Sequence, residues 1–539
     1  MSVFNKNFFG VDEKKSLLAI AVYTFIFFNS VHFLGIVQLN AGRFNYNIYD
    51  WSALVVAITV VLLALILAVK HRFSIPSRHY FPWFFIGLVL LFAALFVREY
   101  FGFLDINSIL YHVVVGMDGV QLDADIYYVG GSIFIALMSL SLALYNLGKY
   151  SLQVRKFLNL LTLPMLLLNP VSLAYAKNIM IDVADLAPGR GIYKAVEYIA
   201  PIRDERKNII HIYLESTEHT LEHITDSQWA MEPLQRIAST GFQASAVRQV
   251  ASTGWTIAGI VASQCGVPLV YPSLQRLSWH NGNPSFLPGV DCLPDILEQS
   301  GYTTVFARGF NLEFAGTDSF LNSHSYSRSI GLMAHENYVD RPKNHWGSYD
   351  DDIYRFAIDE INQLARGDAP YYFTLTTNGG HFPNGHVSPS CRKGTNTEWS
   401  HIDIVNAIAC TNHLTEEFVR ELNQRGLLEN TIVVIQSDHL LMRSPLTPML
   451  DKHERVNFFS IIGDGVKPAI SNKEASMMDV YPTILEFAGY EIVDRKAGLG
   501  VSLLSEHPSL LEQFGQVTVD HSLVANKELS VAIWAAGDP

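Results

Sequence analysis

The sequence predicts a chain of two parts: an N-terminal transmembrane domain of five helices and a C-terminal α/β domain with a largely parallel central sheet. Three observations support this fold class. The mean hydropathy over the 539 residues is +0.18, a positive value that is typical of proteins with membrane segments. Long apolar runs are confined to the first 176 residues, and from about residue 208 short apolar runs alternate with longer helical stretches.

The composition excludes two broad classes of protein. Hydrophobic residues make up 49% of the chain and charged residues only 17%, and so much apolar surface could not stay solvated in a disordered chain. The net charge is −13 and no Lys- or Arg-rich run is present, whereas nucleic-acid binding requires a concentrated basic face. We therefore expect no nucleic-acid partner.

Five apolar runs in the N-terminal part approach the length of about 20 residues that crosses a lipid bilayer. They are Leu17–Val37, Ala53–Val69, Pro82–Val97, Tyr127–Tyr145 and Phe157–Tyr175. Buried helices of a soluble core explain so many long runs poorly, and the four later runs argue against a cleaved signal peptide at the first. The sequence thus predicts a multi-pass membrane protein.

Basic residues in the short loops predict the orientation of these spans. Lys14 and Lys15 precede the first run and further Lys and Arg residues follow the second and fourth, whereas the other loops hold only Arg43 and Arg98. Because basic loops stay in the cytoplasm, the amino terminus is predicted to be cytoplasmic, and five spans then place the rest of the chain outside. The expected domains are a transmembrane domain over 1–176, a juxtamembrane interfacial linker over 177–207 and an extracytoplasmic domain over 208–539.

The four cysteines all lie in the second half of the chain. They are Cys265, Cys292, Cys391 and Cys410, and none has the C-x-x-C spacing of a zinc or redox site. An extracytoplasmic location favours two disulfide bonds, for which three pairings are open. We expect the local pairing, Cys265 with Cys292 and Cys391 with Cys410.

Short apolar runs in the C-terminal part predict buried strands. They are Ile209–Leu214, Thr303–Ala307, Tyr371–Thr376, Thr431–Ser437 and Asn457–Ile462. Helical stretches such as Ile353–Leu364 and Val405–Leu422 separate them. This alternation is typical of an α/β domain with a largely parallel sheet.

Polar side chains follow four of these runs where each predicted strand ends. They are Glu215, Arg308, the segment Thr377–His381 and the pair Asp438-His439. Ligands of open parallel sheets bind beyond the carboxyl ends of the strands, so we expect these groups to gather at one edge. Glu, Asp and His together suit Mn²⁺, Zn²⁺ or Mg²⁺ better than a metal selected by thiolates. Each residue alone is weak evidence, because a Glu at a strand end is commonly a helix cap and an Asp-His pair a surface turn.

A candidate nucleophile lies in the segment Ser252-Thr253-Gly254-Trp255, which precedes a predicted helix over Ile257–Gln264. The N-terminus of a helix favours a phosphate group. A threonine hydroxyl is a poor nucleophile unless a base or a metal activates it, and metal coordination would link Thr253 to the Glu, Asp and His set. Taken alone, the segment is more typical of a helix cap provided by Ser252 or Thr253.

These segments resemble the phosphoglycerol transferases that modify osmoregulated periplasmic glucans. The resemblance rests on Leu214–Ser216, Thr253–Gly259, Val261–Pro268, Asn311–Gly316, Trp346–Asp351 and Ser437–Leu440, and covers the second half of the chain and, more loosely, the first. The wider relatives are the lipoteichoic acid synthases, within the alkaline phosphatase/sulfatase superfamily. A sulfatase would need Cys or Ser in a C-x-P-S-R-like signature, which Cys265-Gly266-Val267-Pro268 does not provide, so sulfate-ester hydrolysis is disfavoured.

The resemblance implies one divalent cation, usually Mn²⁺, with Thr253 as the nucleophile. The implied ligands of this cation are Glu215, Thr253, Asp438 and His439. The resemblance also implies that His381 contacts the phosphoglycerol group.

One residue of the family pattern has no match in this sequence. An arginine contacts the phosphoglycerol group in lipoteichoic acid synthases, but Phe314–Asp318 reads Phe-Ala-Gly-Thr-Asp. Arg308 or Asn311 is expected to substitute for it, and Trp255 is a candidate for the wall of the substrate pocket.

The resulting hypothesis is an enzyme on the periplasmic side of a bacterial inner membrane. It would transfer phosphoglycerol from phosphatidylglycerol to a periplasmic or cell-envelope glycan through Thr253 and release diacylglycerol. His381 is expected to protonate the leaving oxygen or to steady the phosphate, and a structural role for it is equally open. The alternatives are a phosphoethanolamine transferase of the same fold and a non-catalytic membrane scaffold with a vestigial sulfatase-like domain.

Overall fold

The computed structural model describes residues 197–202, 205–270, 285–392 and 400–535, together with Trp83, Ile86, Gly87, Val89 and Tyr111. The chain divides into two compact units, Met1–Leu104 with Leu122–Ile179, and Asp105–Gln121 with Met180–Pro539. Apart from four positions in the third run, the five predicted spans lie outside the described residues, as do the loops that predict their orientation. Among the described residues, no helix has the length and apolar character needed to cross a membrane.

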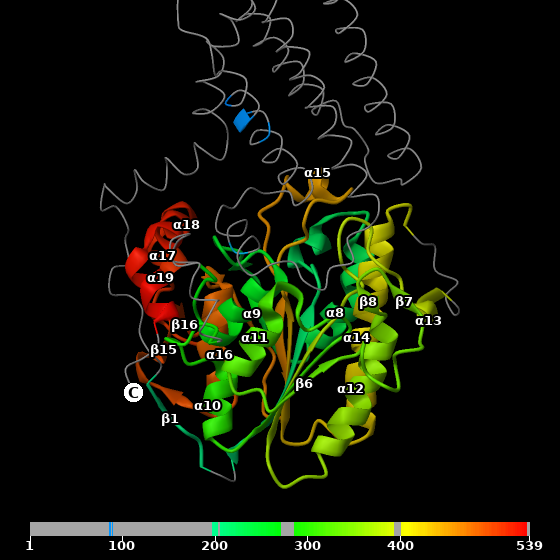
Figure 1. The fold of residues 1–539 in the computed structure, drawn as a ribbon, viewed down its shortest axis with the longest axis horizontal. Coiled ribbons are helices and arrows are strands. Elements are labelled where there is room, and N and C mark those ends of the chain that lie inside the picture. The colour runs from blue at the N-terminus through cyan, green and yellow to red at the C-terminus, as the bar shows by residue number, and fades with distance from the viewer. Residues whose placement is uncertain are drawn as a thin grey trace, which may run out of the picture. The chain divides into compact units, whose positions relative to one another are not determined.

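An eight-stranded sheet forms the centre of the second unit (Figure 1). Its strands are β2 (Asn208–Leu214), β3 (Phe242–Ala244), β5 (Thr303–Arg308), β6 (Arg328–Gly331), β9 (Tyr371–Thr376), β10 (Thr431–Ser437), β11 (Phe459–Gly463) and β12 (Ala469–Ser471). Their order is β12-β3-β11-β10-β2-β9-β5-β6. The strands from β10 to β6 are parallel to one another, and β11 runs antiparallel between β10 and β3.

The five strands predicted from apolar runs are present in this sheet as β2, β5, β9, β10 and β11. The α/β fold with a mostly parallel sheet is thus confirmed for this unit. Residues of β2, β9 and β10 are buried almost throughout, as expected for strands covered on both faces. β11 differs from the prediction: it begins at Phe459 and runs antiparallel, while Asn457 forms isolated bridges with Glu218 and Val247.

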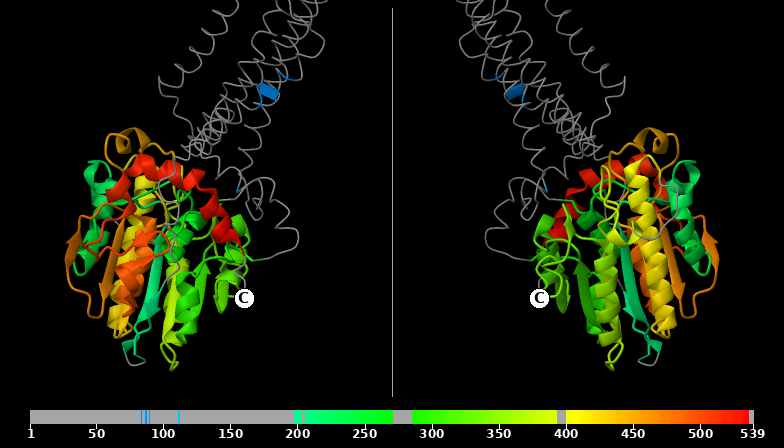
Figure 2. Two further views of the ribbon diagram at one scale, coloured as in Figure 1. Left: turned by 90° about the vertical axis from the view of Figure 1, so that its left-hand side faces the viewer. Right: turned by 90° about the vertical axis from the view of Figure 1, so that its right-hand side faces the viewer.

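Helices cover both faces of the sheet (Figure 1 and Figure 2). They are α8 (Gln228–Ala238), α9 (Thr256–Cys265), α10 (Leu293–Gln299), α11 (Thr317–Ser323), α12 (Asp350–Leu364), α13 (Pro389–Arg392), α14 (Asp403–Gln424), α15 (Thr447–Leu450), α16 (Val480–Phe487), α17 (Leu510–Phe514), α18 (Gln516–Ala525) and α19 (Lys527–Trp534). α8, α12 and α14 lie on one face, and α9, α10 and α16 on the other. The predicted helices are confirmed as α9, α12 and α14, and α12 begins three residues earlier, at an acidic first turn that favours a helix N-terminus.

Short elements complete the unit. The two-stranded pairs are β1 (Tyr198–Ile199) with β14 (Glu491–Ile492), β4 (Val247–Arg248) with β13 (Ala475–Ser476), β7 (Lys343–Asn344) with β8 (Gly347–Ser348), and β15 (Lys496–Ala497) with β16 (Gly500–Val501); the 3₁₀ helices are η2 (His219–His223), η4 (Phe314–Gly316), η5 (Met477–Asp479) and η6 (Val493–Arg495). β1 belongs to the expected linker over 177–207, so pairing with β14 ties the end of that linker to the second unit.

Both expected disulfide bonds are confirmed. Cys265–Cys292 joins the end of α9 to the residue before α10, and Cys391–Cys410 joins α13 to α14. Each bond therefore links helices that are neighbours in sequence.

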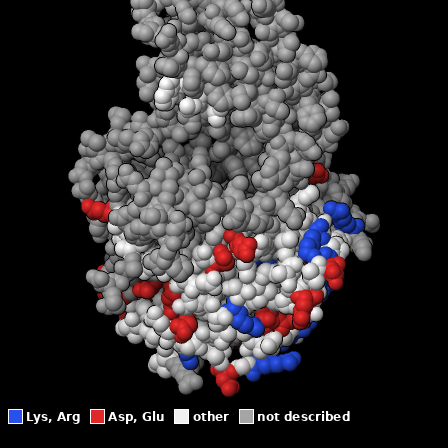
Figure 3. Space-filling view, viewed as in Figure 1, with Lys and Arg blue, Asp and Glu red and all other residues white. Residues whose placement is uncertain are grey.

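Tyr111 shows that the segment Asp105–Gln121 contributes to the core of the second unit. Its side chain is fully buried, and its hydroxyl donates a hydrogen bond to the carbonyl oxygen of Ala315 at 2.6 Å. The ring centroid lies 5.8 Å from that of Trp255 and 6.5 Å from that of Phe286. On the described part of the face in Figure 3, acidic and basic side chains are interspersed.

Candidate metal and phosphate site

The register of the central strands explains why distant polar residues meet at one sheet edge. Leu214 at the end of β2 is opposite Ser437 at the end of β10, and Thr376 at the end of β9 is opposite both Tyr213 and Arg308. The residues that follow these positions therefore leave the sheet together, as expected for the carboxyl ends of parallel strands.

Glu215, Asp438 and His439 form a compact buried cluster. Their relative exposures are 5%, 1% and 2%, and one ligand atom of each lies within 4.8 Å of the others. The Nε2 atom of His439 is 3.5 Å from Oε1 of Glu215 and 3.4 Å from Oδ2 of Asp438. This burial excludes the alternative of a surface turn for the Asp-His pair.

The tautomer of His439 follows from its other ring nitrogen. Nδ1 lies 2.8 Å from the carbonyl oxygen of Leu440, and a carbonyl can only accept, so Nδ1 carries a proton. In the neutral ring, the Nε2 lone pair then faces two carboxylate oxygens, an arrangement that repels unless a cation or a proton lies between them. Metal-bound histidines commonly donate their second N–H to a carbonyl in this way. The residues present therefore fit a divalent cation.

The protonation tendencies of the cluster have the same origin. Burial, together with the neighbouring Glu215, raises the pKa of Asp438 to about 7. Burial lowers the pKa of His439, but the charges of Asp438 and Glu215 more than reverse this, so the pKa is raised above its ordinary value. Excess negative charge in a buried site is what a bound cation would neutralise.

Thr253 lies in the turn before α9; one side of this turn contacts Asp438 of the cluster and the other contacts Leu440, the residue after His439. Gln249 accepts a hydrogen bond from the N–H of Leu440 at 2.8 Å, and the side chain of Thr256 hydrogen bonds with Asp438. The Thr253 hydroxyl is buried and donates to the carbonyl oxygen of Val250 at 2.8 Å. The N-cap residue of α9 is Trp255, without a side-chain cap bond, so the alternative of a Ser252 or Thr253 cap is wrong. Ser252 has φ 61°, a strained conformation of the kind found at functional sites.

The guanidinium of Arg308 is buried at the same edge of the sheet, near Glu215 and Asp438. Its Nη1 donates to Oγ1 of Thr317 at 3.0 Å, and its Nε is buried without a hydrogen-bond partner among the described residues. Burial lowers the pKa of Arg308 to about 10, while the charges of Glu215 and Asp438 act in the opposite direction, so the guanidinium stays charged at pH 7. An unpaired buried donor is costly, and an anionic ligand would satisfy it.

His381 lies at the end of the loop that follows β9. Its Nδ1 is 3.0 Å from the carbonyl oxygen of Phe382, which leaves the lone pair on Nε2. Its ring stacks on Trp346 with centroids 3.7 Å apart. Burial lowers the pKa of His381 to about 4, with smaller contributions from His439 and Arg308, so the ring is neutral at pH 7.

Comparison with known proteins identifies the family of this domain. Residues 207–490, more than half of the chain, match the sequence profile of the sulfatase family. The chain belongs to the sulfatase family. Among curated relatives, phosphoglycerol transferase I of Salmonella typhimurium is 33% identical over 348 residues, which are 63% of this chain and 44% of that protein. The protein of the same name from Citrobacter koseri is 33% identical over 62% of this chain and 43% of its own length, so the match spans less than half of these relatives.

Solved structures resemble the chain more distantly. An alkaline phosphatase superfamily protein from Vibrio parahaemolyticus aligns with a TM-score of 0.47 and 20% identity over 62% of this chain and 79% of that one. Lipoteichoic acid synthase LtaP from Listeria monocytogenes gives 0.45 and 14% over 57% and 79%. The lipooligosaccharide phosphoethanolamine transferase EptA from Neisseria meningitidis gives 0.49 and 14% over 86% and 95%. Likenesses of this size do not assign an activity.

A disulfide bond occupies the one place where the sequence offers a Cys-x-x-Pro stretch, Cys265-Gly266-Val267-Pro268. Cys265 lies at the end of α9, is fully buried and is bonded to Cys292. It therefore offers no free thiol, which agrees with the absence of a C-x-P-S-R-like signature at Cys265–Pro268.

Two further predicted contacts lie at the margins of this cluster. The Asn311 side chain accepts a hydrogen bond from the N–H of Glu313 at 3.1 Å, a contact within its own turn. Trp255 is buried against Tyr111 in the hydrophobic core. Their roles in substrate binding stay predictions.

Sequence reasoning missed Ser216 and Thr317. The Ser216 hydroxyl donates to Oε1 of Glu215 at 2.6 Å, and its N–H donates to Oδ1 of Asp438 at 2.9 Å, so it ties the two carboxylates together. Ser216 directly follows Glu215 in Leu214–Ser216, one of the segments that resemble the family, and this position could have identified it as a candidate. The contact between Arg308 and Thr317 has no counterpart in the local sequence pattern.

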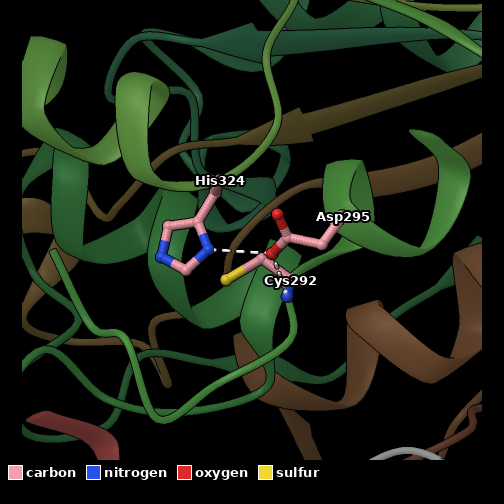
Figure 4. Close-up of side chains that lie close together, drawn as sticks. All are labelled: Cys292, Asp295 and His324. Carbon is pink, nitrogen blue, oxygen red and sulfur yellow. Dashed lines mark hydrogen bonds and ion pairs between the residues drawn. The ribbon is translucent and has the colours of Figure 1, made fainter. Parts of the chain in front are cut away.

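A second group of metal-binding residue types, Cys292, Asp295 and His324, does not form a metal site (Figure 4). The Cys292 sulfur is bonded to Cys265 and provides no thiolate. Asp295 accepts the N–H of Cys292 at 2.8 Å and lies 2.8 Å from Nδ1 of His324. These contacts explain the group as the capped start of α10.

Proposed function

We propose that the chain transfers phosphoglycerol from phosphatidylglycerol to a periplasmic or cell-envelope glycan, through a divalent cation site and a covalent link to Thr253. The observation that carries this proposal is the buried cluster of Glu215, Asp438 and His439, beside which Arg308 holds an Nε that has no hydrogen-bond partner in the described part of the chain. A cation site next to a buried guanidinium suits a phosphodiester, because both positive groups would face its anionic oxygens.

The proposed cation ligands are Glu215, Asp438, His439 and the hydroxyl of Thr253. Carboxylate oxygens with one imidazole suit Mn²⁺, and Zn²⁺ or Mg²⁺ are alternatives. When bound, the cation would neutralise charge on the phosphoryl oxygens and lower the pKa of the Thr253 hydroxyl. Ser216 and the carbonyl of Leu440 hold the ligand side chains in orientation.

The chemistry balances in two steps. The Thr253 oxygen forms a bond to phosphorus, the bond from phosphorus to the diacylglycerol oxygen breaks, and the proton of Thr253 ends on diacylglycerol. A glycan hydroxyl then bonds to phosphorus, the bond to Thr253 breaks, and the glycan proton returns to Thr253. Positioning and charge neutralisation supply the catalysis of both displacements.

Arg308 is proposed to bind the phosphoryl oxygens in place of the family arginine that has no match in this chain. The hydroxyl of Thr317 accepts a hydrogen bond from Nη1 of Arg308, and Thr317 belongs to the stretch Phe314–Asp318 where that arginine has no match. The guanidinium therefore reaches from position 308 to the missing residue's neighbourhood.

His381 is proposed to accept a proton from the attacking glycan hydroxyl. Its Nδ1 donates to the carbonyl oxygen of Phe382, and its lowered pKa leaves the ring neutral at pH 7, so the Nε2 lone pair is available as an acceptor and the ring has no proton there to donate. This refines the expectation that it protonates the leaving oxygen.

The location proposed for this reaction is the periplasmic side of a bacterial inner membrane. A lipid donor requires a site next to the bilayer, and the five apolar runs of the sequence would hold the enzyme there. The basic loops predict that the domain after residue 207 lies outside the cytoplasm.

The test uses full-length protein in lipid vesicles that contain labelled phosphatidylglycerol, with Mn²⁺ and a glucan acceptor. Thr253→Ala should reduce diacylglycerol release below detection, and Thr253→Ser should retain measurable activity because it keeps a hydroxyl. Normal turnover by Thr253→Ala would remove the covalent mechanism.

The donor is tested by offering phosphatidylglycerol and phosphatidylethanolamine together. Mass spectrometry of Thr253 should find glycerophosphate, whereas phosphoethanolamine at this residue would replace the proposed donor. A wild-type protein that binds no metal and turns over neither lipid would favour the non-catalytic scaffold.

A further inference from the structure

Asp350 holds the backbone of the loop that leads to His381. It is the first residue of α12 and is almost fully buried. Its Oδ1 accepts the N–H of Asn378 at 2.7 Å, and the N–H of Gly379 lies 3.2 Å from Oδ1 and 3.1 Å from Oδ2. The hydroxyl of Thr411 on α14 donates to Oδ2 at 2.5 Å. Every one of these contacts is a donor directed at the carboxylate.

The carboxylate is ionised at neutral pH in spite of its burial. Burial raises the pKa of Asp350 to about 6, and the N–H groups of Asn378 and Gly379 and the Thr411 hydroxyl limit the rise. An ionised carboxylate with backbone N–H donors makes strong hydrogen bonds, so the loop is held firmly at this point.

The loop passes very close to Asp350 and to the backbone of Glu215. A Cβ atom at Gly379 would overlap both Oδ2 of Asp350 and Oγ1 of Thr411. A Cβ atom at Gly380 would overlap the carbonyl oxygen of Glu215. The loop therefore passes between Asp350 and the backbone of a proposed metal ligand, in a gap that only glycine fits.

The segment before Asp350 also contacts this loop, at Asn378 and at His381. The side-chain amide of Asn378 donates to the carbonyl oxygens of Trp346 at 3.2 Å and Ser348 at 3.1 Å. The Trp346 ring stacks on the His381 imidazole with an interplanar angle of 25°. One short segment thus fixes both the backbone of the loop and the plane of the histidine ring.

We propose that Asp350 is a positioning residue for catalysis, which sets His381 against the metal and phosphate site by clamping the backbone at Asn378 and Gly379. The proposal rests on the proposed function, because Asp350 acts through His381. Asp350 itself touches neither the cluster of Glu215, Asp438 and His439 nor the Thr253 turn in the contacts of the described residues.

The test is a double-mutant cycle between Asp350→Asn and His381→Ala, measured as kcat and KM for glycerophosphate transfer by full-length protein. An asparagine must turn its NH₂ group either toward the N–H groups of Asn378 and Gly379 or toward the N–H of Gly379 and the Thr411 hydroxyl. It therefore offers the loop one accepting oxygen instead of two, and it carries no negative charge, so the clamp is weakened. Because small misplacements of reacting groups cost up to about a hundredfold, we expect Asp350→Asn to lower kcat by roughly 10- to 100-fold with little change in the donor KM. In the His381→Ala background, the same substitution should change kcat less than about threefold, since coupled residues are not additive.

Asp351→Asn is the matched control. Asp351 is the next residue of the same acidic run, and its carboxylate accepts the N–H of Ser390 at 3.2 Å, away from the clamp. Its substitution should leave kcat unchanged. The amount of metal bound per protein molecule, measured by inductively coupled plasma mass spectrometry, should be equal in all variants.

Three outcomes decide the proposal. An equal loss of kcat from Asp350→Asn with and without His381 would show a merely structural role and overturn it. Full activity of His381→Ala would also overturn it, whereas activity of Thr253→Ala would instead sink the proposed function. If Asp350→Asn does not fold, Thr411→Val removes one donor to the Asp350 carboxylate and should lower kcat only where His381 is present; an equal loss of kcat with and without His381 would reject the proposal.

Discussion

Ser216 is the residue on which the shape of the candidate metal site depends most directly. Its hydroxyl and its N–H contact Glu215 and Asp438, the two carboxylates that come from different strands. It adopts φ 56°, a conformation that a residue other than glycine holds only when its surroundings enforce it. Groups that orient metal ligands in this way commonly change metal affinity although they do not touch the metal.

We expect Ser216→Ala to lower the affinity for Mn²⁺ by about 10- to 100-fold, because Glu215 loses the donor that orients it. Isothermal titration calorimetry on metal-free protein measures this change. Ser216→Gly separates the hydroxyl from the backbone strain, since glycine adopts φ 56° freely but also lacks the hydroxyl. Both variants should lose affinity.

The control for this prediction is Ser239→Ala, an exposed serine whose hydroxyl donates to the carbonyl oxygen of Arg236. It should bind Mn²⁺ as the wild type does. Wild-type affinity in Ser216→Gly, with loss only in Ser216→Ala, would show that strain rather than the hydroxyl matters.

At the scale of elements, two glycines let the strand ends and helices approach closely enough to build the site. A Cβ atom at Gly259 of α9 would overlap the carbonyl oxygen of Asp438, and one at Gly380 would overlap that of Glu215. α9 and the loop after β9 therefore rest directly on the backbone of the two carboxylate residues. This contact fixes the distance between the Thr253 turn and the cluster.

Asp479, at the end of η5, connects α16 to β16. Its carboxylate accepts the N–H of Ser476 at 2.7 Å and the N–H of Val501 at 2.7 Å. Burial raises the pKa of Asp479 from 3.8 to about 6. The folded state thus disfavours the charged form. This residue's contribution to stability is greatest below pH 4 and is lost as the pH rises through 6.

We predict that Asp479→Asn becomes more stable relative to the wild type as the pH rises from 4 to 6. The variant has no group to ionise, and one proton changes the free energy of unfolding by at most about 1.4 kcal/mol for each pH unit. Midpoints of thermal unfolding of both proteins across this range measure the difference. Asp368→Asn, at an exposed loop position, is the control, and a difference that falls with pH would contradict the prediction.

The sequence predicts those elements whose signal is local. Apolar runs predict β2, β9 and β10, and the short separations between cysteines predict both disulfide bonds. The antiparallel direction of β11 was not predictable, because an apolar run carries no information on strand direction.

The residues of the candidate site divide in the same way. Glu215, Asp438 and His439 follow strands and were predicted together, whereas the contact of Arg308 with Thr317 and that of Asp350 with Gly379 depend on long-range packing. Asp350 lies within Trp346–Asp351, a segment that resembles the family, but only the fold shows that it holds the loop of His381.

At the scale of the whole molecule, Tyr111 shows that the second unit is not continuous in sequence. It comes from a segment between the third and fourth apolar runs, yet it packs on Trp255, two residues after the proposed nucleophile. Its hydroxyl donates a hydrogen bond to the carbonyl oxygen of Ala315. The same stretch contains Thr317, which accepts a hydrogen bond from Arg308. Tyr111 thus contacts both the nucleophile turn and the arginine region.

We expect Tyr111→Ala to destabilise the second unit by about 3–5 kcal/mol, because it removes a fully buried aromatic ring. We expect Tyr111→Phe to destabilise it by about 1 kcal/mol, because it keeps the ring but removes the hydrogen bond to Ala315. Denaturant unfolding of the full-length protein in detergent, followed by tryptophan fluorescence, measures both changes. Phe514→Ala, at a partly exposed ring on α17, should change stability much less. Equal stability of Tyr111→Ala and the wild type would show that the stability of the second unit does not depend on this ring, and that the contact of Tyr111 with Trp255 does not stabilise the Thr253 turn.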